Sequence, residues 1–266
     1  MGFIQTPNLP ESDVATAAVS GTYQAVTDAL RARNIEVLPV KPCKALSRPV
    51  CCHADMLLHH LGGNRIVAAN GEEDLKIRLE QLGFEVSCSN KCISNSYPQD
   101  VILNCARVGN RLLANWKVMD GTIYEYCRAN RIEITNVRQG YAKCSTVIVD
   151  SRSVITADPS IAEAAERIRM DVLKIKPGYV NLQGYEYGFL GGACGMIGKG
   201  KLAFTGSIQN HPDYPGMKSF CDQKKVELIS LTNGPLLDIG GILPLKTVSE
   251  KKHWKEIEIL DCPIKK

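Results

Sequence analysis

Cysteine, histidine and aspartate side chains are the ones in this sequence that could carry out covalent chemistry together. The sequence has eleven cysteines, and His53 stands two residues before Asp55 in the segment HADM. A thiolate is a nucleophile, and a neighbouring cation such as a protonated histidine makes the thiolate available. A histidine can also pass protons between reacting groups. A cysteine that folds beside His53 would therefore be a candidate nucleophile.

Length and composition narrow the class of protein to which the chain can belong. Its 266 residues are 44% apolar and 23% charged, which is ordinary globular composition. The net charge is 32 − 28 = +4, and this small excess does not favour a nucleic-acid partner. The first residues show no signal segment, and no apolar run approaches the roughly 18 residues of a membrane span. We therefore expect a cytoplasmic protein without a membrane partner, whose reduced cysteines are core residues, metal ligands or catalysts.

Four segments of the sequence repeat one pattern. Each has a short apolar run, a small or polar turn, a second apolar run and a capping-type residue, at residues 53–70, 98–115, 143–158 and 191–206. The corresponding points of successive repeats are Asp55, Asp100, Cys144, Gly192 and Gly241. The distances between neighbouring points are 45, 44, 48 and 49 residues. Such a period indicates one structural unit used several times.

The unit reads as strand, strand, helix, strand. Turn residues such as Gly109-Asn110 connect the first two strands. The clearest helix begins at Asp158-Pro159, with aspartate as N-cap and proline at the first helical position. A matching helix is expected over Glu72–Leu82, with Gly83 after its end. A further strand closes each unit, at residues 84–88, 132–137, 171–175 and 226–231.

A fifth unit is predicted to be split across the two ends of the chain. Its hairpin is expected near Leu237–Val248, its helix within Glu11–Arg33 and its last strand at Ile35–Val40. A closed ring would bring the two ends together, and 266/5 gives about 53 residues per unit. No linker divides the chain, so we expect a single domain over residues 1–266. An open α/β sheet with accidental periodicity is the alternative.

These repeats resemble the pentein superfamily, whose members are five-fold pseudosymmetric α/β propellers of strand–strand–helix–strand units and include guanidino-group-modifying enzymes. His53-Ala-Asp55-Met56 resembles the His-x-Asp element of agmatine and arginine deiminases. The glycine pairs Gly191-Gly192 and Gly240-Gly241 resemble the start of later units, where they allow close approach of backbones. The segments GYAKCS and YGFLGGA resemble an uncharacterised bacterial branch of the fold.

The resemblance implies an enzyme but does not supply the usual nucleophile. In the deiminases the cysteine lies in the last unit after a glycine run, whereas Leu243 and Pro244 occupy that region here. The histidine and cysteine of the deiminases lie about two units apart. Two units after His53 comes Cys144, at 144 − 53 = 91 residues. We therefore predict Cys144 as nucleophile and His53 as proton carrier, and Cys194 is the rival thiol.

Carboxylates are the groups expected to hold the substrate. A guanidinium carbon becomes electrophilic when the cation is held by charge-assisted hydrogen bonds. Asp55 would lie on the same face as His53 if this segment is a strand, and Asp100 would face the centre of the ring. Glu186 and Asp238 are further carboxylates for the same task. The predicted enzyme is a cysteine-dependent hydrolase or amidinotransferase, it needs no cofactor, and its small guanidinium-type substrate and oligomeric state are not specified by the sequence.

Two other functions are compatible with the sequence. Penteins include a ribosome-subunit anti-association factor without a nucleophile, so the chain could be a non-catalytic binding protein and Cys144 a small buried residue. It could also be a structural metal protein, because thiolates and imidazole are suitable Zn²⁺ ligands. That ligand set would come from Cys43, Cys51, Cys52 and His53, with Cys88 or Cys92. The default role of the cysteines in predicted strands, helices or the tail is packing (Cys88, Cys105, Cys127, Cys221 and Cys262).

Overall fold

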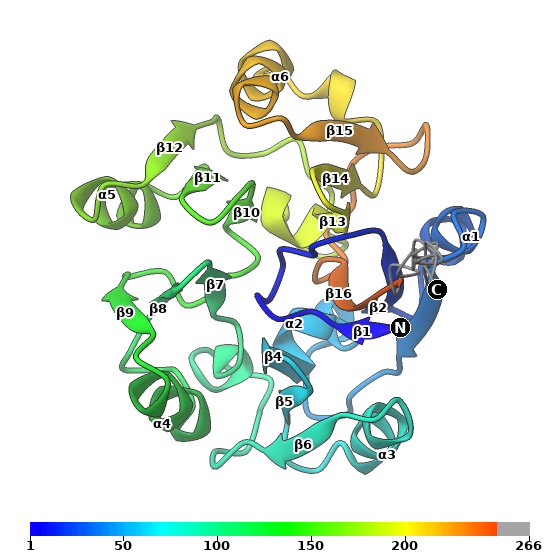
Figure 1. Cartoon of the computed structure of the whole chain (residues 1–266), viewed down its shortest axis with the longest axis vertical. Helices are drawn as coiled ribbons and strands as arrows, with labels where there is room; N and C mark the ends of the chain where they lie inside the picture. Colours follow the sequence, from blue (N-terminus) through cyan, green and yellow to red (C-terminus); the bar gives the residue numbers. More distant parts are fainter. Residues whose placement is uncertain (249–266) are drawn as a thin grey trace, which may run out of the picture.

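Each repeat of the sequence folds into a small three-stranded sheet with one helix beside it. The computed structural model describes residues 1–248 of the chain. In each unit two antiparallel strands are followed by a helix and a third strand parallel to the second. Figure 1 shows these sheets arranged around a common centre, with the helix of each unit on the outside.

Four units follow one another along the chain, in the predicted order. The first consists of β4 (Leu58–Gly62), β5 (Arg65–Ala68), α3 (Glu73–Gln81) and β6 (Glu85–Cys88). The second consists of β7 (Ala106–Val108), β8 (Arg111–Ala114), α4 (Gly121–Ala129) and β9 (Glu133–Asn136). The third consists of β10 (Val147–Ile148), β11 (Ser153–Thr156), α5 (Pro159–Arg167) and β12 (Asp171–Lys174). The fourth consists of β13 (Cys194–Gly198), β14 (Lys201–Phe204), η4 (Ile208–Asn210), α6 (Tyr214–Gln223) and β15 (Glu227–Ser230).

The fifth unit joins the two ends of the described chain as predicted, but its first two strands differ from the prediction. β16 (Leu243–Thr247) pairs antiparallel with β2 (Val14–Ser20), which pairs parallel with β3 (Glu36–Val40). α1 (Gln24–Arg31) connects β2 to β3, and β1 (Gly2–Phe3) is added beside β16. The predicted hairpin near Leu237–Val248 is therefore wrong, because β16 pairs with β2 from the other end of the chain. The helix predicted within Glu11–Arg33 and the strand predicted at Ile35–Val40 are confirmed by α1 and β3. All seven residues of β2 are buried, and a short apolar run buried on both faces shows no strand alternation in the sequence.

The predicted ends of two helices are confirmed. The carboxylate of Asp158 accepts a hydrogen bond from the backbone N–H of Ile161 at 2.9 Å, and α5 begins at Pro159. α3 is followed by Leu82 and then by Gly83, whose φ of 87° lies in the left-handed region that favours glycine. Local capping chemistry therefore fixes where these helices begin and end.

Replacing Asp158 by alanine is expected to lower stability modestly. The change removes the N-cap acceptor of α5, and loss of such a cap costs about 1 kcal/mol. The melting temperature should fall by roughly 2–4 °C in thermal denaturation. Asp28→Ala is the matched control, because Asp28 lies within α1 and its carboxylate makes only exposed side-chain contacts, an ion pair with Arg31 and a hydrogen bond from Gln24. Equal shifts for both variants would contradict the capping role.

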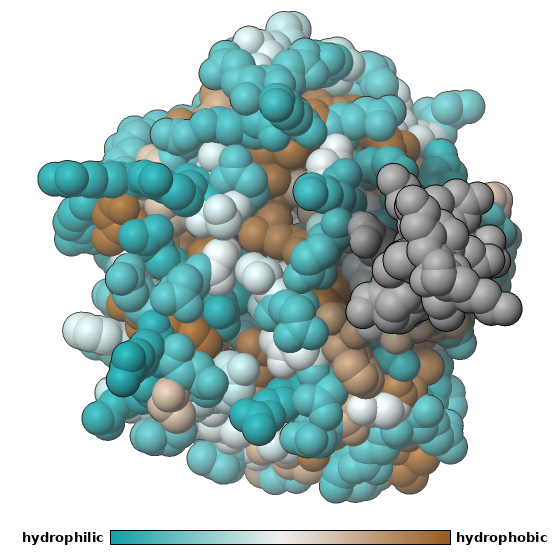
Figure 2. Space-filling view, viewed as in Figure 1, coloured by the Kyte–Doolittle hydropathy of each residue, from teal (hydrophilic) through white to brown (hydrophobic). Residues whose placement is uncertain are grey.

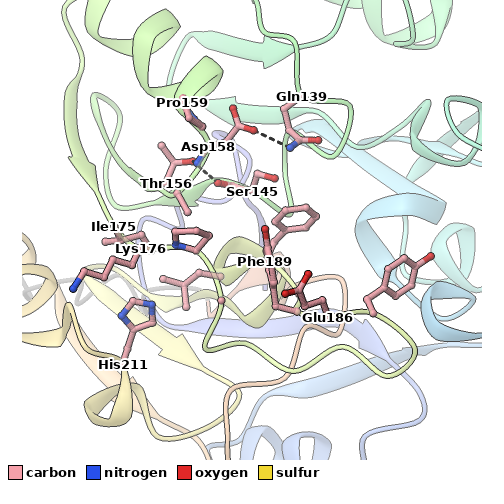
Figure 3. Close-up of a pocket in the computed structure, with 17 residues that line it drawn as sticks. Gln139, Ser145, Thr156, Asp158, Pro159, Ile175, Lys176, Glu186, Phe189 and His211 are labelled. Carbon is pink, nitrogen blue, oxygen red and sulfur yellow. Dashed lines mark hydrogen bonds between the residues drawn. The ribbon is translucent and has the colours of Figure 1, made fainter.

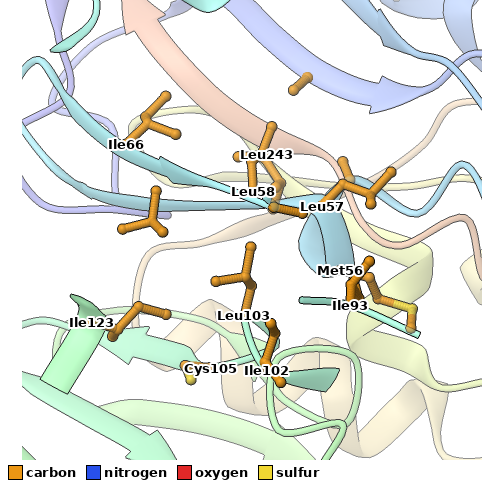
Figure 4. Packing of buried hydrophobic residues seen from close by; sticks show 14 of the residues in the cluster. Met56, Leu57, Leu58, Ile66, Ile93, Ile102, Leu103, Cys105, Ile123 and Leu243 are labelled. Atoms are coloured by element: carbon orange, nitrogen blue, oxygen red, sulfur yellow. The ribbon is translucent and has the colours of Figure 1, made fainter. Parts of the chain in front are cut away.

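Buried apolar side chains from different units pack together and hold the ring closed. In the largest cluster Leu58 of β4 and Leu243 of β16 lie with Leu103, which precedes β7. Figure 4 shows these three side chains close to Met56 and Leu57.

In Figure 2 hydrophilic residues cover most of the rim of the molecule, and hydrophobic residues show nearer the middle of this face. None of the helices within residues 1–248 has the length and apolar character needed to cross a membrane.

Short helical turns stand at the inner start of several units and position the candidate site residues. α2 (Ala54–Leu57) precedes β4, η2 (Gln99–Val101) precedes β7, and η3 (Leu190–Ala193) precedes β13, while η1 (Arg48–Val50) leads into the first unit. Asp55 lies in α2, and His53 is its N-cap residue. The expectation of a strand with both side chains on one face is therefore wrong, because a helix of four residues is too short to produce a helical period in the sequence.

Candidate active site

The structure brings Cys144, His53 and Asp238 together in the interior of the ring. The sulfur of Cys144, a ring nitrogen of His53 and a carboxylate oxygen of Asp238 lie within 4.8 Å of one another. These residues come from the start of the third unit, the start of the first unit and the segment before β16. Each is at most 2% exposed. The repeat therefore places side chains that are distant in sequence at one buried point.

Asp55 and Asn104 hold the Cys144 side chain in place. The thiol of Cys144 donates to Oδ2 of Asp55 at 3.0 Å, and Nδ2 of Asn104 donates to the sulfur at 3.2 Å. Oδ1 of Asn104 also accepts from the backbone N–H groups of Lys143 and Cys144, at 2.8 and 3.2 Å. The turn before β10 is thus fixed by a side chain of the second unit.

Asp238 is held by backbone donors and faces His53. Its Oδ2 accepts from the N–H of Phe189 at 2.8 Å, and its Oδ1 accepts from the N–H of Gly240 at 3.1 Å. Oδ1 also lies 3.8 Å from Nδ1 of His53. A Cβ atom on Gly192 would stand 2.0 Å from Oδ1, so the carboxylate fits there only because residue 192 is glycine.

Several polar atoms of this cluster have no hydrogen-bond partner. Both ring nitrogens of His53 and Oδ1 of Asp55 are buried and unpaired. Unpaired buried polar atoms cost free energy, so native structures contain few of them. These unpaired atoms are donors and acceptors that a bound molecule could satisfy.

The electrostatics of the cluster keep Cys144 protonated. Burial raises the pKa of the Cys144 thiol well above its ordinary value, and the nearby Asp55 and Asp238 carboxylates raise it further, while Lys143 opposes them. Burial also raises the pKa of Asp238, and the neighbouring His53 opposes that shift. A cation placed between Asp55 and Asp238 would reverse the effect of the two acids and favour the thiolate.

The sequence did not indicate the positions of Asn104 and Lys143. Lys143 is buried, and its Nζ donates to the backbone oxygen of Gly191 at 3.1 Å. Asn104 looked like an ordinary polar residue between apolar runs. Its position four residues after Asp100, in the repeat segment before β7, is the only sequence signal that could have indicated it.

Asp100 and Glu186 are not part of this buried cluster. Oδ2 of Asp100 accepts a hydrogen bond from the hydroxyl of Tyr141, which turns the carboxylate toward the aromatic ring instead of the Cys144 sulfur. Burial raises the pKa of Tyr141, and the hydrogen bond to Asp100 raises it further. Glu186 is exposed in the segment between β12 and η3, on the wall of a separate cavity. Of the four predicted carboxylates, Asp55 and Asp238 therefore lie in the cluster.

Cys194 lies in the interior but has different surroundings. Its sulfur approaches the backbone oxygen of Gly191 at 3.9 Å. Burial raises the pKa of Cys194 to about 12, with Lys143 opposing the shift. No carboxylate or imidazole accepts from its thiol among the described hydrogen bonds. Cys144 is therefore the better placed of the two thiols for reaction with a cation.

The predicted metal cluster of cysteines does not form in the described part of the chain. Within residues 1–248, His53, Cys144 and Asp238 make the one group of three or more potential ligands close enough to hold an ion. The sulfurs of Cys51 and Cys52 lie 3.9 Å apart, but Cys43, Cys88 and Cys92 do not join them. The ten described cysteines are free thiols, and Cys262 lies outside the described residues. A thiolate, an imidazole and a carboxylate would suit Zn²⁺.

Comparison with known proteins places the chain among structures with this ring. A model of a family of unknown function (DUF6873) matches residues 18–243. A search of curated protein sequences finds no significant match. Among solved structures, the chain is similar to an amidinotransferase of the saxitoxin biosynthetic pathway from Microseira wollei. The identity is 12%, the TM-score is 0.52, and 85% of this chain and 91% of that chain are covered.

Two further solved structures show the same similarity. The agmatine deiminase of C. jejuni is 8% identical with a TM-score of 0.54, over 87% of this chain and 90% of that one. The inosamine-phosphate amidinotransferase of Streptomyces griseus is 8% identical with a TM-score of 0.54, over 92% of this chain and 97% of that one. Together with the five sheets of Figure 1, these similarities confirm the predicted pentein-like fold with five-fold pseudosymmetry.

Proposed function

The chain belongs to the family of unknown function DUF6873, and from this membership and its pentein-like fold we propose that it is a cysteine-dependent enzyme acting on a guanidinium-type substrate. The single observation that carries the proposal is the buried set of Cys144, His53, Asp55 and Asp238. It contains a nucleophile, a proton carrier and two acceptors for a cation. The fold alone would not imply this chemistry.

Asp55 and Asp238 bind the guanidinium in the proposed mechanism. Oδ1 of Asp55 is unpaired, and carboxylates form short charge-assisted hydrogen bonds with guanidinium N–H groups. The bound cation neutralises the two charges that keep Cys144 protonated. The substrate therefore creates the thiolate that attacks it, and the thiol stays unreactive while the site holds no cation.

The covalent step exchanges a carbon–nitrogen bond for a carbon–sulfur bond. His53 accepts the proton of the Cys144 thiol, the sulfur attacks the central guanidinium carbon, and His53 delivers that proton to the leaving nitrogen as the C–N bond breaks. The products of this step are an amine or ammonia and a thiouronium adduct on Cys144. Water, or a second amine, then attacks the adduct carbon, His53 accepts a proton, and the C–S bond breaks. Hydrolysis gives a ureido product, and attack by an amine gives amidino transfer.

The proposed enzyme is one domain that works in the cytoplasm and needs no cofactor. The ten described cysteines carry no disulfide bond, as in a reducing compartment. Every group in the proposed reaction is supplied by the chain, the substrate, and water or an acceptor amine.

Two small reagents test the proposal. Chloroacetamidine is a cation that resembles a guanidinium, and chloroacetamide is its neutral counterpart. For each cysteine, the rate of labelling by chloroacetamidine is divided by the rate of labelling by chloroacetamide. Because two carboxylates favour the cation, this ratio should be about 100-fold higher at Cys144 than at Cys92. Cys92 is an exposed thiol of the same chain, so it corrects for the intrinsic difference between the reagents. Peptide mass spectrometry over time measures both sites.

Matched serine variants identify the thiol. Cys144→Ser should remove the amidine-selective label, and Cys194→Ser should leave it. Circular dichroism checks that both variants fold. Equal reagent ratios at Cys144 and Cys92 would contradict the enzyme and would favour the non-catalytic binding protein.

A further inference from the structure

A cavity lies beside the buried cluster and has no role in the chemistry above. Its volume is about 670 Å³, within the range typical of small-molecule sites. Apolar and aromatic side chains line much of it, including Ile175, Pro159, Pro177, Tyr185, Tyr187 and Phe189. Figure 3 shows Lys176 and His211 on one side and Phe189 with Glu186 on the other.

Two buried polar atoms in the walls of this cavity have no partner. They are Oγ of Ser145 and Nε2 of His211, on residues 6% and 2% exposed. Nδ1 of His211 accepts from the backbone N–H of Asp213 at 3.1 Å, so the ring proton of neutral His211 is on Nε2. Burial lowers the pKa of His211, which favours this neutral form. His211 therefore holds an unpaired N–H donor in the wall of the cavity.

The wall between this cavity and the cluster is one segment thick. Gly188, Phe189 and Leu190 line the cavity, and the N–H of Phe189 donates to Asp238. A Cβ atom on Gly188 would lie 2.5 Å from Cβ of Asp238. On another wall Ser145 lines the cavity and directly follows Cys144 in the chain. A substrate that displaces the Phe189 side chain would reach from this cavity to the buried cluster.

Resting on the proposed function, we infer that this cavity binds the tail of the guanidinium substrate, and that the tail is a bulky, largely apolar group carrying a hydrogen-bond acceptor. The guanidinium would lie between Asp55 and Asp238. The acceptor would pair with Nε2–H of His211, and aromatic side chains would cover the apolar part. A short aliphatic guanidine would leave most of the 670 Å³ unfilled.

Three synthetic guanidines separate the parts of this inference. N-(4-guanidinobutyl)benzamide has a ring and an acceptor, N-(4-guanidinobutyl)acetamide has the acceptor without the ring, and 6-phenylhexylguanidine has the ring without the acceptor. Their affinities are measured calorimetrically with Cys144→Ala protein, which cannot react. The benzamide should bind about tenfold or more tightly than each of the others, because ring burial and the buried hydrogen bond each add affinity.

Variants of residues that line the cavity show which contacts give the benzamide its higher affinity. His211→Asn can keep an acceptor for the Asp213 N–H but removes the Nε2 donor, so it should cancel the advantage of the benzamide over 6-phenylhexylguanidine. Tyr187→Ala should reduce the advantage of the ring, whereas Tyr124→Ala should not. Tyr124 is the matched control because these tyrosines are 41% and 40% exposed and only Tyr187 lines the cavity. Neither cavity variant should change chloroacetamidine labelling of Cys144.

The outcomes separate this inference from the proposed function. If the benzamide binds no tighter than the acetamide while Cys144 still prefers chloroacetamidine, the tail assignment is wrong and the enzyme proposal stands. If N-butylbenzamide, which lacks the guanidinium, binds as tightly as the guanidino compound, the cavity is not joined to the cluster and the inference is overturned. Loss of the amidine preference, in contrast, is a failure of the proposed function itself.

Discussion

Replacing Asp55 by asparagine is expected to speed the reaction of Cys144 with chloroacetamide and to slow its reaction with chloroacetamidine. Asp55 raises the pKa of the Cys144 thiol by its charge and by accepting the S–H hydrogen bond. Asparagine has nearly the same shape but no charge, so the thiolate fraction at neutral pH should rise. One pKa unit corresponds to about tenfold in that fraction. The neutral reagent should therefore react about tenfold faster.

The cationic reagent should respond in the opposite direction because it loses one of its two carboxylates. A charge-assisted hydrogen bond contributes about 1.5–3 kcal/mol, which is roughly ten- to 100-fold in rate or affinity. The higher thiolate fraction acts on both reagents and cancels in their ratio, so the amidine preference of Cys144 over Cys92 should fall by roughly ten- to 100-fold. Rates of peptide labelling at fixed pH measure each reagent separately, so an opposite change in the two rates can be distinguished from general loss of structure.

Asp100→Asn is the matched control for this charge change. Asp100 is also buried, at 6% exposed, but its carboxylate accepts from Tyr141 and does not touch the Cys144 sulfur. Removing the charge of Asp100 should leave the ratio of chloroacetamidine to chloroacetamide labelling at Cys144 within about twofold of that in the unchanged protein. A response as large as that of Asp55→Asn would mean that the total charge of the interior controls Cys144. In that case Asp55 would have no specific part in holding the cation.

The pH dependence of the neutral reaction follows from the same electrostatics. The pKa of Cys144 is raised in the folded protein, so the thiolate fraction keeps increasing through the pH range in which an ordinary thiol is already ionised. Chloroacetamide labelling of Cys144 should still rise with pH between about pH 9 and 10, above the pH range in which an ordinary cysteine thiol ionises. In Asp55→Asn protein the plateau should move to lower pH.

The sequence was informative about the units because their signals are local. Turn residues, the Asp158 cap and the period of the repeat all act within one unit, and the structure confirms four units in the predicted order. The split unit was harder because β2 is buried on both faces and pairs with a strand more than 220 residues away, since Val14 pairs with Thr247. Such pairing depends on ring closure and not on the local pattern.

The cluster was predicted only in part because its remaining contacts cross between units. The repeat position indicated Cys144, and the local motif indicated His53 and Asp55. Asn104 could not be recognised, because its role exists only once the second unit packs against the turn before β10. Sequence also could not separate Asp238 from Asp100, since both are acids near repeat starts. Their environments differ through the backbone donors around Asp238 and the Tyr141 hydroxyl beside Asp100.

Replacing Gly195 by alanine is expected to cause the largest loss of stability among the variants considered. Gly195 lies in β13, where a Cβ atom would stand 2.0 Å from the backbone oxygen of Ile242 and 2.9 Å from the carbonyl carbon. Ile242 also donates its N–H to the backbone oxygen of Cys194 at 3.1 Å. The clash is therefore between two paired backbones at the contact of the fourth and fifth units, and no flexible side chain can relieve it. Inserting atoms into such a packed contact costs about 3 kcal/mol, which should lower the melting temperature by roughly 10 °C.

Gly216→Ala makes the same chemical change where there is room for the methyl group. Gly216 lies in α6, is exposed, and has no atom within 4 Å of a built Cβ. Alanine favours the helix over glycine by about 1 kcal/mol, so this variant should be slightly more stable. Thermal and urea denaturation of both proteins therefore gives shifts of opposite sign if close backbone contact closes the ring. A stable Gly195→Ala protein would show that the fourth and fifth units can separate at this contact. The buried cluster, which spans the first, third and fifth units, would then depend on closure elsewhere in the ring.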